Sequence, residues 1–402
     1  MLLTVALRGL LRNRRRTVVS LATMAIGSAA LFLFQGFNTG LLNEYRNNAI
    51  HAHYGNGQIN NRGYRDKILA RPWEAWIADP ESVLNSLRQI DGVSHVFPRL
   101  EVAGLISNGT RSLGARGMGI DGRAESSFFH TINVIQGNAL NDSRDGIVLG
   151  KGLAESLGLA VGDRVTLLAN TVFGSLNGAD LFVTGVFHTG SRELDDSFFQ
   201  IQIDQAQLLL DTQKVEKISI GLSRHEDWPR VAQHIEQLPF GLEATPFEVL
   251  DKIYYQNSVD FLNAIYSLVG FVILFVVVLG VFNTSTSSIL ERTQEIGMLR
   301  ANGESKRDIF MLIACEGLIA SVVGALIGLL SIVLLDTLFL GEGFYMPPGP
   351  GITRSFKTFI ALDVRMGFES LFLIVIAGVS GAVLAVLKVV QTSIAHTLRQ
   401  VG

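Results

Sequence analysis

The chain has 402 residues, a net charge of −3 and 17% charged residues, a charged fraction below the about 25% of typical soluble domains. Its mean hydropathy is +0.34, and the apolar residues gather in long runs that predict membrane spans. The net charge gives no reason to expect nucleic-acid binding, which usually shows as a basic face. The lone Cys315 excludes an intrachain disulfide.

Four apolar segments are long enough to cross a bilayer, because a spanning helix needs about 20 such residues. They are residues 17–37, 261–282, 309–335 and 371–389. The first outruns the about 7–15 apolar residues of a cleaved signal peptide, so we interpret it as an uncleaved anchor. Arginines and lysines precede the first span, occupy the loop 290–308 and flank the last span. The positive-inside rule therefore predicts that both termini, the loop and the tail 390–402 are cytoplasmic.

Residues 38–260 and the loop 337–368 are then expected outside. The larger segment has the composition of an α+β domain, predicted as two βαβ halves with a β-rich insertion at about 108–212. Helical apolar spacing at 80–90 and 226–238 marks the helix of each half. Strand-like runs flank these helices, at 57–59, 93–106, 217–222 and 242–247. Further strands are predicted in the insertion, at 146–149, 164–168, 181–187 and 198–203.

Three features of this region could be mistaken for ligand-binding or metal-binding sites. Residues 146–152 (GIVLGKG) lack the spacing of a phosphate loop, so we predict a turn before a helix. The acidic residues Glu193, Asp195 and Asp196 fit a solvated turn better than a Ca²⁺ site. His51 and His53 alternate as on one strand face, and two histidines are a weak metal signal. We assign no catalytic, metal-binding or cofactor-binding residue and do not expect an enzyme.

Small and charged residues also interrupt the spans. Gly324 and Gly328 form a GxxxG motif, for which we favour packing within the chain over a dimer face. Glu316 is an intramembrane carboxylate, and such residues are costly and suggest function. It lies about 10 Å beyond the start of its span, so we expect it to face a neighbouring helix or the cytoplasmic rim rather than relay protons.

The cytoplasmic segment 291–303 predicts a short amphipathic helix that ends at Gly303. Ile296 and Leu299 form an apolar ridge on it. Charged residues flank this ridge, namely Glu291, Arg292, Glu295 and Arg300. Two interpretations stay open: a helix that lies on the membrane surface, or one that docks into a groove of a cytoplasmic partner.

This segment resembles the signature of the FtsX-like permeases, the MacB-type (type VII) ABC transporter permeases that include lipoprotein-releasing subunits. The matching positions are Arg292, Glu295, Ile296, Gly297, Arg300, Ala301, Gly303, Ser305 and Glu316. Asn302 and Glu304 depart from the signature. Residues 147–166 resemble the family's periplasmic core domain, and residues 1–16 are similar to its cytoplasmic amphipathic N-terminal helix.

The resemblance implies a non-catalytic permease subunit of a bacterial inner membrane. The chain carries no Walker A motif, so ATP and Mg²⁺ would bind to a separate cytoplasmic ATPase dimer, and a second permease, identical or different, would complete the unit. The implied coupling residues are Glu291, Arg292, Glu295, Ile296, Gly297, Leu299, Arg300 and Gly303. Segments 39–49 and 247–260 would transmit motion as stalks.

Release of a lipoprotein or another amphipathic substrate is the function that the resemblance favours, with a periplasmic lipoprotein, chaperone or adaptor as further partner. Two alternatives stay open. One is a tripartite efflux or secretion permease, and the other is an FtsX-type regulator of periplasmic cell-wall hydrolases.

Overall fold

The computed structural model describes residues 12, 14–68, 71–130, 133–140, 143–301, 303–347 and 355–390. The chain divides into two compact units. The helical unit contains residues 1–43, 258–345 and 357–402, and the sheet unit contains residues 44–257 and 346–356. Most of the predicted N-terminal helix and all but the first residue of the tail 390–402 lie outside the described residues.

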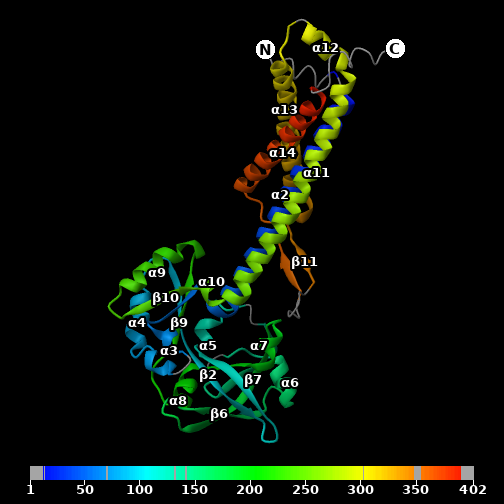
Figure 1. Cartoon of the computed structure of the whole chain (residues 1–402). Helices are drawn as coiled ribbons and strands as arrows, with labels where there is room; N and C mark the ends of the chain where they lie inside the picture. The colour runs from blue at the N-terminus through cyan, green and yellow to red at the C-terminus, as the bar shows by residue number, and fades with distance from the viewer. Residues whose placement is uncertain are drawn as a thin grey trace. The chain divides into compact units, whose positions relative to one another are not determined.

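Four long helices make up most of the helical unit (Figure 1). They are α2 (Arg14–Ala49), α11 (Asn257–Glu291), α13 (Lys306–Leu335) and α14 (Val364–Val390). Each contains one of the four predicted apolar segments, and by length and composition all four can cross a membrane. One apolar cluster joins them, with Met24, Val277, Ala320 and Ile374 at its centre.

Close contacts at glycines hold these helices together. A Cβ added at Gly328 would lie 2.2 Å from the Ala25 carbonyl oxygen of α2, and one at Gly324 would lie 2.7 Å from Met24 Cβ. Both distances are below what real side chains allow, so only glycine permits this approach. The expectation that the GxxxG motif packs within the chain is confirmed.

Short elements connect the spans. Helix α12 (Thr293–Ala301) follows α11, and Gly303 adopts a φ of +98° just after it, a conformation that favours glycine at a helix end. Ser305 and Asp308 then form a capping box that starts α13. Beyond α13 lie η5 (Asp336–Leu340) and the paired strands β11 (Phe344–Met346) and β12 (Phe356–Thr358).

The first part of the sheet unit contains the two predicted βαβ halves. One half is β1 (Gly57–Asn61), α4 (Pro80–Leu87) and β2 (Val93–Ser107), and the other is β9 (Lys217–Leu222), α9 (Trp228–Gln237) and β10 (Leu242–Pro246). The strand order is β10-β1-β9-β2, with antiparallel neighbours. The halves are therefore interleaved, and α4 and α9 cover the same core.

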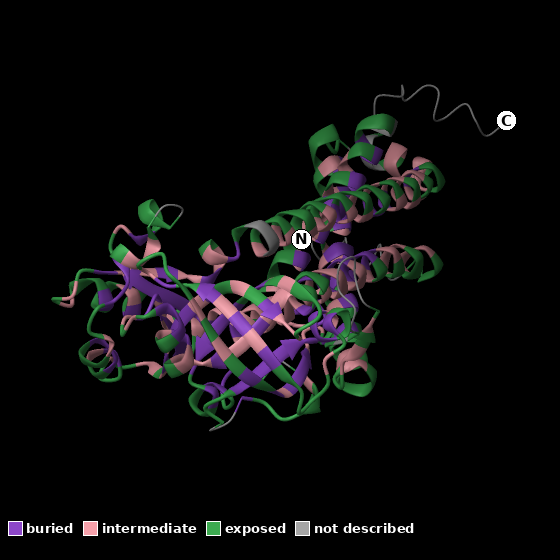
Figure 2. Ribbon diagram, turned by 90° about the horizontal axis from the view of Figure 1, so that it is seen from below, coloured by how far each residue is buried: buried purple, intermediate pink, exposed green. Residues whose placement is uncertain are grey.

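The β-rich part closes into a ring. Its strands are β3 (Ser112–Ile120), β5 (Gly146–Gly150), β6 (Arg164–Asn170), β7 (Leu176–His188) and β8 (Phe198–Gln202). Pairing runs β2–β3–β8–β5–β7–β6 and returns to β2. Because β2 also pairs with β9, this one strand belongs to both parts. Figure 2 shows buried residues along these strands.

Smaller elements complete the sheet unit. Strand β4 (Asn133–Gly137) pairs with β7, and the short helices lie in the connections. They are η1 (Ile50–Tyr54), α3 (Tyr64–Lys67), η2 (Pro72–Ala75), α5 (Gly122–Glu125), α6 (Lys151–Leu157), α7 (Arg192–Ser197), α8 (Ile203–Leu210), η3 (His225–Asp227), α10 (Phe247–Leu250) and η4 (Lys252–Gln256). The strand predicted at 146–149 is confirmed as β5, but the turn predicted within 146–152 is wrong, because β5 ends at Gly150 and α6 begins at Lys151.

Two further local predictions are wrong, the second of them in part. His51 and His53 lie in η1, a π-helical turn that follows α2 directly, rather than on a strand. The helical run stops at Gly55, which has a φ of +72°. The acidic cluster lies in the helix α7 rather than in a turn, and although Glu193 and Asp196 are exposed, Asp195 is only 4% exposed. Its carboxylate accepts hydrogen bonds from Thr189 N at 2.7 Å and His188 Nδ1 at 2.6 Å, so it fixes the β7–α7 connection.

Candidate functional site

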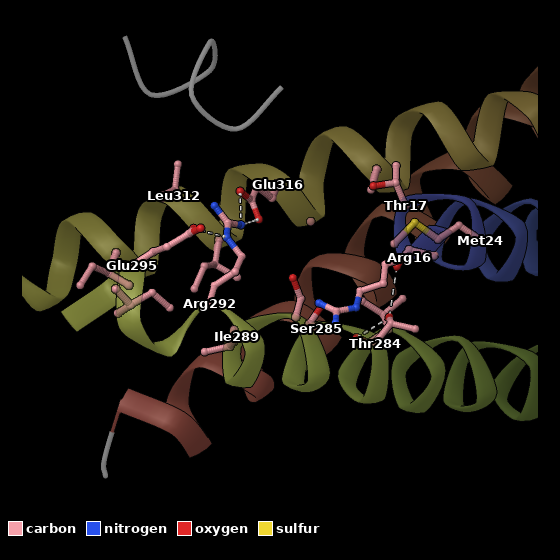
Figure 3. Close-up of a pocket in the computed structure, with 18 residues that line it drawn as sticks. Arg16, Thr17, Met24, Thr284, Ser285, Ile289, Arg292, Glu295, Leu312 and Glu316 are labelled. Carbon is pink, nitrogen blue, oxygen red and sulfur yellow. Dashed lines mark hydrogen bonds and ion pairs between the residues drawn. The ribbon is translucent and has the colours of Figure 1, made fainter. Parts of the chain in front are cut away.

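Helices of the helical unit meet around a pocket of about 80 Å³, at the end of the unit where α11 finishes and α13 begins (Figure 3). Charged and hydroxyl side chains gather there from α2, α11, α12 and α13. These polar lining residues are Arg16, Thr17, Ser20, Thr284, Ser285, Ser288, Arg292, Glu295 and Glu316. Three of the residues implied by the family resemblance therefore share one site with the intramembrane carboxylate Glu316.

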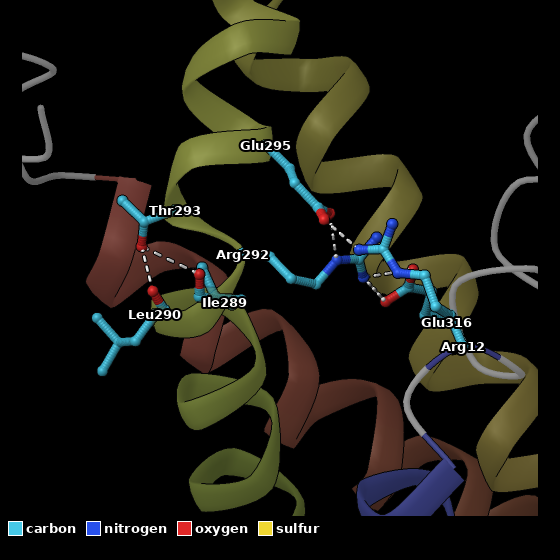
Figure 4. Close-up of polar contacts among 7 residues, drawn as sticks. All are labelled: Arg12, Ile289, Leu290, Arg292, Thr293, Glu295 and Glu316. Atoms are coloured by element: carbon cyan, nitrogen blue, oxygen red, sulfur yellow. Dashed lines mark hydrogen bonds and ion pairs between the residues drawn. The ribbon is translucent and has the colours of Figure 1, made fainter.

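Arg292 is the centre of this site (Figure 4). It stands at the junction between α11 and α12, and its Nη1 donates hydrogen bonds to both Glu316 oxygens at 2.9 and 3.1 Å. Its Nε donates to Glu295 Oε2 at 3.3 Å. The side chains of Arg292 and Glu316 are only 19% and 13% exposed. Charge-assisted hydrogen bonds are stronger than neutral ones, so the pairing of Arg292 with Glu316 ties the start of α12 to α13.

A second arginine extends the chain of charges. Arg12 donates to Glu295, so Arg12, Glu295, Arg292 and Glu316 alternate in sign. Burial opposes the charge on Arg292, but hydrogen bonds and charge from Glu316 and Glu295 raise its pKa. The Arg12 guanidinium, with Arg292 beside it, lowers the pKa of Glu295. We therefore expect Glu295 and Arg292 to be charged at neutral pH.

Helix α12 has two different faces. Ile296 on its inner face packs against the cluster of Ile289, Ile309, Ile313, Ala385 and Val386. Gln294, Met298 and Ala301 are exposed, and their spacing places them on one helix face. Met298 is 62% exposed, and a Cβ added at Gly297 would meet no atom within 4 Å. One face is anchored and the opposite face is open.

The remaining predicted coupling residues are placed as follows. Glu291 ends α11, is 67% exposed and contacts Arg16. Gly303 follows α12 in its left-handed conformation. Leu299 and Arg300 lie within α12, but their side chains lie outside the described residues.

Sequence reasoning missed part of this site. It named Arg292 and Glu316 but did not pair them, because a separation of 24 residues has no periodic signature. It also placed Ile296 on an apolar ridge that would face either the membrane surface or a partner, whereas Ile296 faces inward. The spacing 294, 298, 301 was the available signal for the open face, since it follows helical periodicity. Within the described ranges, no group of three or more His, Cys, Asp or Glu side chains could hold a metal ion.

Comparison with known proteins places the chain in a family. A model of the MacB-like periplasmic core domain matches residues 17–238, more than half of the chain. A model of the FtsX-like permease C-terminal region matches residues 267–394. The second match contains α12, Arg292 and Glu316.

Individual relatives agree with this placement. An uncharacterized ABC transporter permease protein of Mycobacterium tuberculosis is 27% identical over 72% of this chain and 34% of its own length. The lipoprotein-releasing system transmembrane protein LolC of Neisseria meningitidis is 25% identical over 79% of this chain and 76% of its own length. The chain thus spans about a third of the mycobacterial relative.

A solved structure of the periplasmic region of MacB from Actinobacillus actinomycetemcomitans is 14% identical, with a TM-score of 0.38, over 51% of this chain and 94% of that one. Together with the four long apolar helices, the family matches identify the chain as an ABC transporter permease of the MacB/LolC type, with a MacB-like periplasmic core domain and an FtsX-like permease C-terminal region.

Proposed function

We propose that this chain couples ATP hydrolysis by a separate cytoplasmic ATPase to conformational change in the sheet unit, and so releases a lipoprotein or another amphipathic substrate from a bacterial inner membrane. The observation that carries the proposal is the two-faced helix α12. Its inner face is tied to α13 through Arg292 and Glu316, and its outer face is exposed at Gln294 and Met298.

An exposed amphipathic helix fits a groove on a partner protein. Gln294, Met298 and Ala301 would enter such a groove on the ATPase, which would hold ATP and Mg²⁺. An ATPase dimer would engage two permeases, as a homodimer or a heterodimer. A push on α12 would then reach α13 through the paired charges of Arg292 and Glu316.

The lengths of two helices support transmission across the bilayer. Helix α2 has 36 residues and α11 has 35, which at 1.5 Å per residue gives about 54 and 52 Å. The hydrocarbon core is about 30 Å thick, so each helix is long enough to extend beyond it. The proposed stalk 39–49 lies entirely within α2, whereas the stalk 247–260 is divided between α10, η4 and the first turn of α11.

Direction and substrate are inferred from the basic flanks of the spans and from a relative. The basic flanks of the spans favour cytoplasmic termini and a periplasmic sheet unit. The likeness to LolC, a lipoprotein-releasing protein by name, favours a lipoprotein substrate with a periplasmic lipoprotein, chaperone or adaptor as partner. Depletion of the protein should leave lipoproteins in the inner membrane. Unchanged lipoprotein sorting, with capture of an adaptor or a cell-wall hydrolase, would instead favour efflux or hydrolase regulation.

Docking on α12 can be tested by purification of the tagged chain with its ATPase. Met298→Asp puts a charge on the open face, and Gly297→Trp adds bulk where the chain itself has free space. Both variants should fold and lose the ATPase. Leu208→Asp is the matched control, because Leu208 is an exposed apolar residue of the sheet unit at 54% exposure. Retention of the ATPase by both α12 variants, or absence of any ATPase from the wild-type purification, would contradict the proposal.

A further inference from the structure

The pocket beside α12 contains hydrogen-bond donors that the coupling network does not use. Arg16 Nη1 is buried and has no hydrogen-bond partner in the described part of the chain. Ser285 and Ser288, one turn apart on α11, are half-buried and line the same pocket. An unsatisfied buried donor is costly, so Arg16 Nη1 points to a bound acceptor, to which the two nearby serine hydroxyls could also donate.

The charges around the pocket favour an anion at the Arg16 side. Glu295 and Glu316 also line the pocket, but Arg12 and Arg292 pair with them. Glu291, which contacts Arg16 through the other guanidinium nitrogen, is 67% exposed to solvent. Arg14 and Arg15 are exposed on the adjoining turn of α2 and add positive charge with no described carboxylate partner.

The pocket lining changes from polar to apolar along the helices that form it. On α2 it passes from Arg16, Thr17 and Ser20 to Met24, over about 12 Å of helix axis. On the antiparallel α11 it passes from Ser288 and Ser285 to Val281. Polar groups thus lie at the ends of the candidate spans, where lipid headgroups are expected, and apolar groups lie further along the helices. A soluble anion would use only the polar part, whereas a lipid would use both.

From these observations we propose that the pocket binds the phosphate-bearing headgroup of an anionic membrane lipid, with Arg16 as the principal ligand and Ser285 and Ser288 as further donors. A volume of about 80 Å³ holds about five to eight water molecules at 10–15 Å³ each, so the pocket can accept a small polar group. Because Arg292 and Glu316 line the same pocket, lipid occupancy would also affect how firmly α12 is held.

Native mass spectrometry of the full chain in detergent tests the site with three probes: phosphatidylglycerol, diacylglycerol with the same acyl chains, and inorganic phosphate. Wild type should retain phosphatidylglycerol but not diacylglycerol, and millimolar phosphate should not displace the lipid. Arg16→Gln should bind the lipid roughly tenfold or more weakly, as expected for loss of a charged hydrogen bond. Arg14→Gln is the matched control, because it removes the same charge from an exposed position.

The double variant Ser285→Ala with Ser288→Ala keeps Arg16 and its contact to Glu291. This double variant should weaken lipid binding several-fold. It provides a second test of the site if size-exclusion chromatography shows that Arg16→Gln does not fold. Equal losses for Arg14→Gln and Arg16→Gln would show general attraction to the basic segment and overturn the site. Equal retention of diacylglycerol, or displacement by phosphate, would overturn the lipid headgroup as ligand. None of these outcomes depends on the ATPase.

Discussion

The two units hold their charged residues in different ways. In the sheet unit, Arg99 and Glu125 are 2% and 3% exposed and pair at 2.8 and 2.6 Å. The Arg99 guanidinium also lies 4.0 Å from the centre of the Phe129 ring and donates to the His53 carbonyl. In the helical unit, Arg292 and Glu316 remain partly exposed, and their chain of charges continues to a 40% exposed Glu295.

This difference has a physical consequence. A sealed pair, meaning a fully buried one such as Arg99 and Glu125, has lost its hydration, so separating its charges costs much free energy. Burial also raises the pKa of Glu125, although Arg99 opposes the rise. A partly hydrated network can change partners at lower cost. We infer that Arg99 and Glu125 fix η1 to the sheet, whereas the network around Arg292 suits an element that moves when a partner docks.

Breaking the sealed pair should have the largest effect. Arg99→Ala leaves Glu125 buried without a cation and should lower the free energy of unfolding of the sheet unit by about 3–5 kcal/mol. Tryptophan fluorescence can follow this unfolding, because all three tryptophans, Trp73, Trp76 and Trp228, belong to the sheet unit.

The matched control for Arg99→Ala is Arg164→Ala. Arg164 pairs with Asp180 on the surface, at 66% and 47% exposure, so its loss should cost less than about 1 kcal/mol. If Arg99→Ala and Arg164→Ala lower the free energy of unfolding equally, the distinction between sealed and hydrated pairs is wrong.

A buried carboxylate with no cation should give the next largest effect. Burial raises the pKa of Asp251 to about 6, although a hydrogen bond from Tyr54 opposes the rise. The Asp251 carboxyl therefore binds its proton more tightly in the folded state than in the unfolded state. The protonated Asp251 carboxyl stabilises the fold by up to about 3 kcal/mol. This stabilisation is complete below pH about 4 and is lost as pH rises through about 6. Asp251→Asn should raise stability at pH 8 and flatten this dependence in fluorescence-monitored unfolding.

Asp180→Asn supplies a control of opposite sign. Thr166 and Arg164 lower the pKa of Asp180, so its stabilising contribution is present above its unfolded pKa and lost in acid. Its replacement should slightly reduce stability at pH 8. A stability increase in both asparagine variants would contradict the role given to burial at Asp251.

The helical unit should respond to packing rather than to charge. Gly328→Val would force Cβ against the Ala25 carbonyl of α2 and should cost about 1–3 kcal/mol, measured as a lower thermal aggregation temperature in detergent. Gly297→Ala, which meets no atom within 4 Å, should leave this temperature unchanged or slightly higher. If Gly328→Val is as stable as wild type, α2 and α13 do not pack as described.

Sequence patterns predicted the structural features that depend on residues close together in the chain, such as helices and their ends. Apolar periodicity located α4 and α9, and Gly303 correctly marked the end of a helix, with a φ angle of +98°. Patterns did not predict what depends on distant pairing. The interleaving of β1 with β9, the closure of the ring through β2 and the burial of Asp195 all require contacts between segments that share no local signal.

The same reasoning applies to the site. The helix 293–301 and its neighbour Glu316 could be identified from sequence, but the inward orientation of Ile296 and the pairing of Arg292 with Glu316 could not. Both depend on how α11, α12 and α13 pack, which periodicity within a single segment does not specify.

The central claim is that anchoring of α12 through Arg292 and Glu316 transmits ATPase docking to the spans. ATP hydrolysis by the co-purified ATPase should be measured in nanodiscs with wild type, Arg292→Gln, Glu316→Gln and the double variant. We expect each single variant to keep the ATPase bound but to reduce the hydrolysis rate several-fold, and the double variant to be no worse than either, because the residues act as a pair. Wild-type rates in the single variants, or effects that multiply in the double variant, would contradict this account.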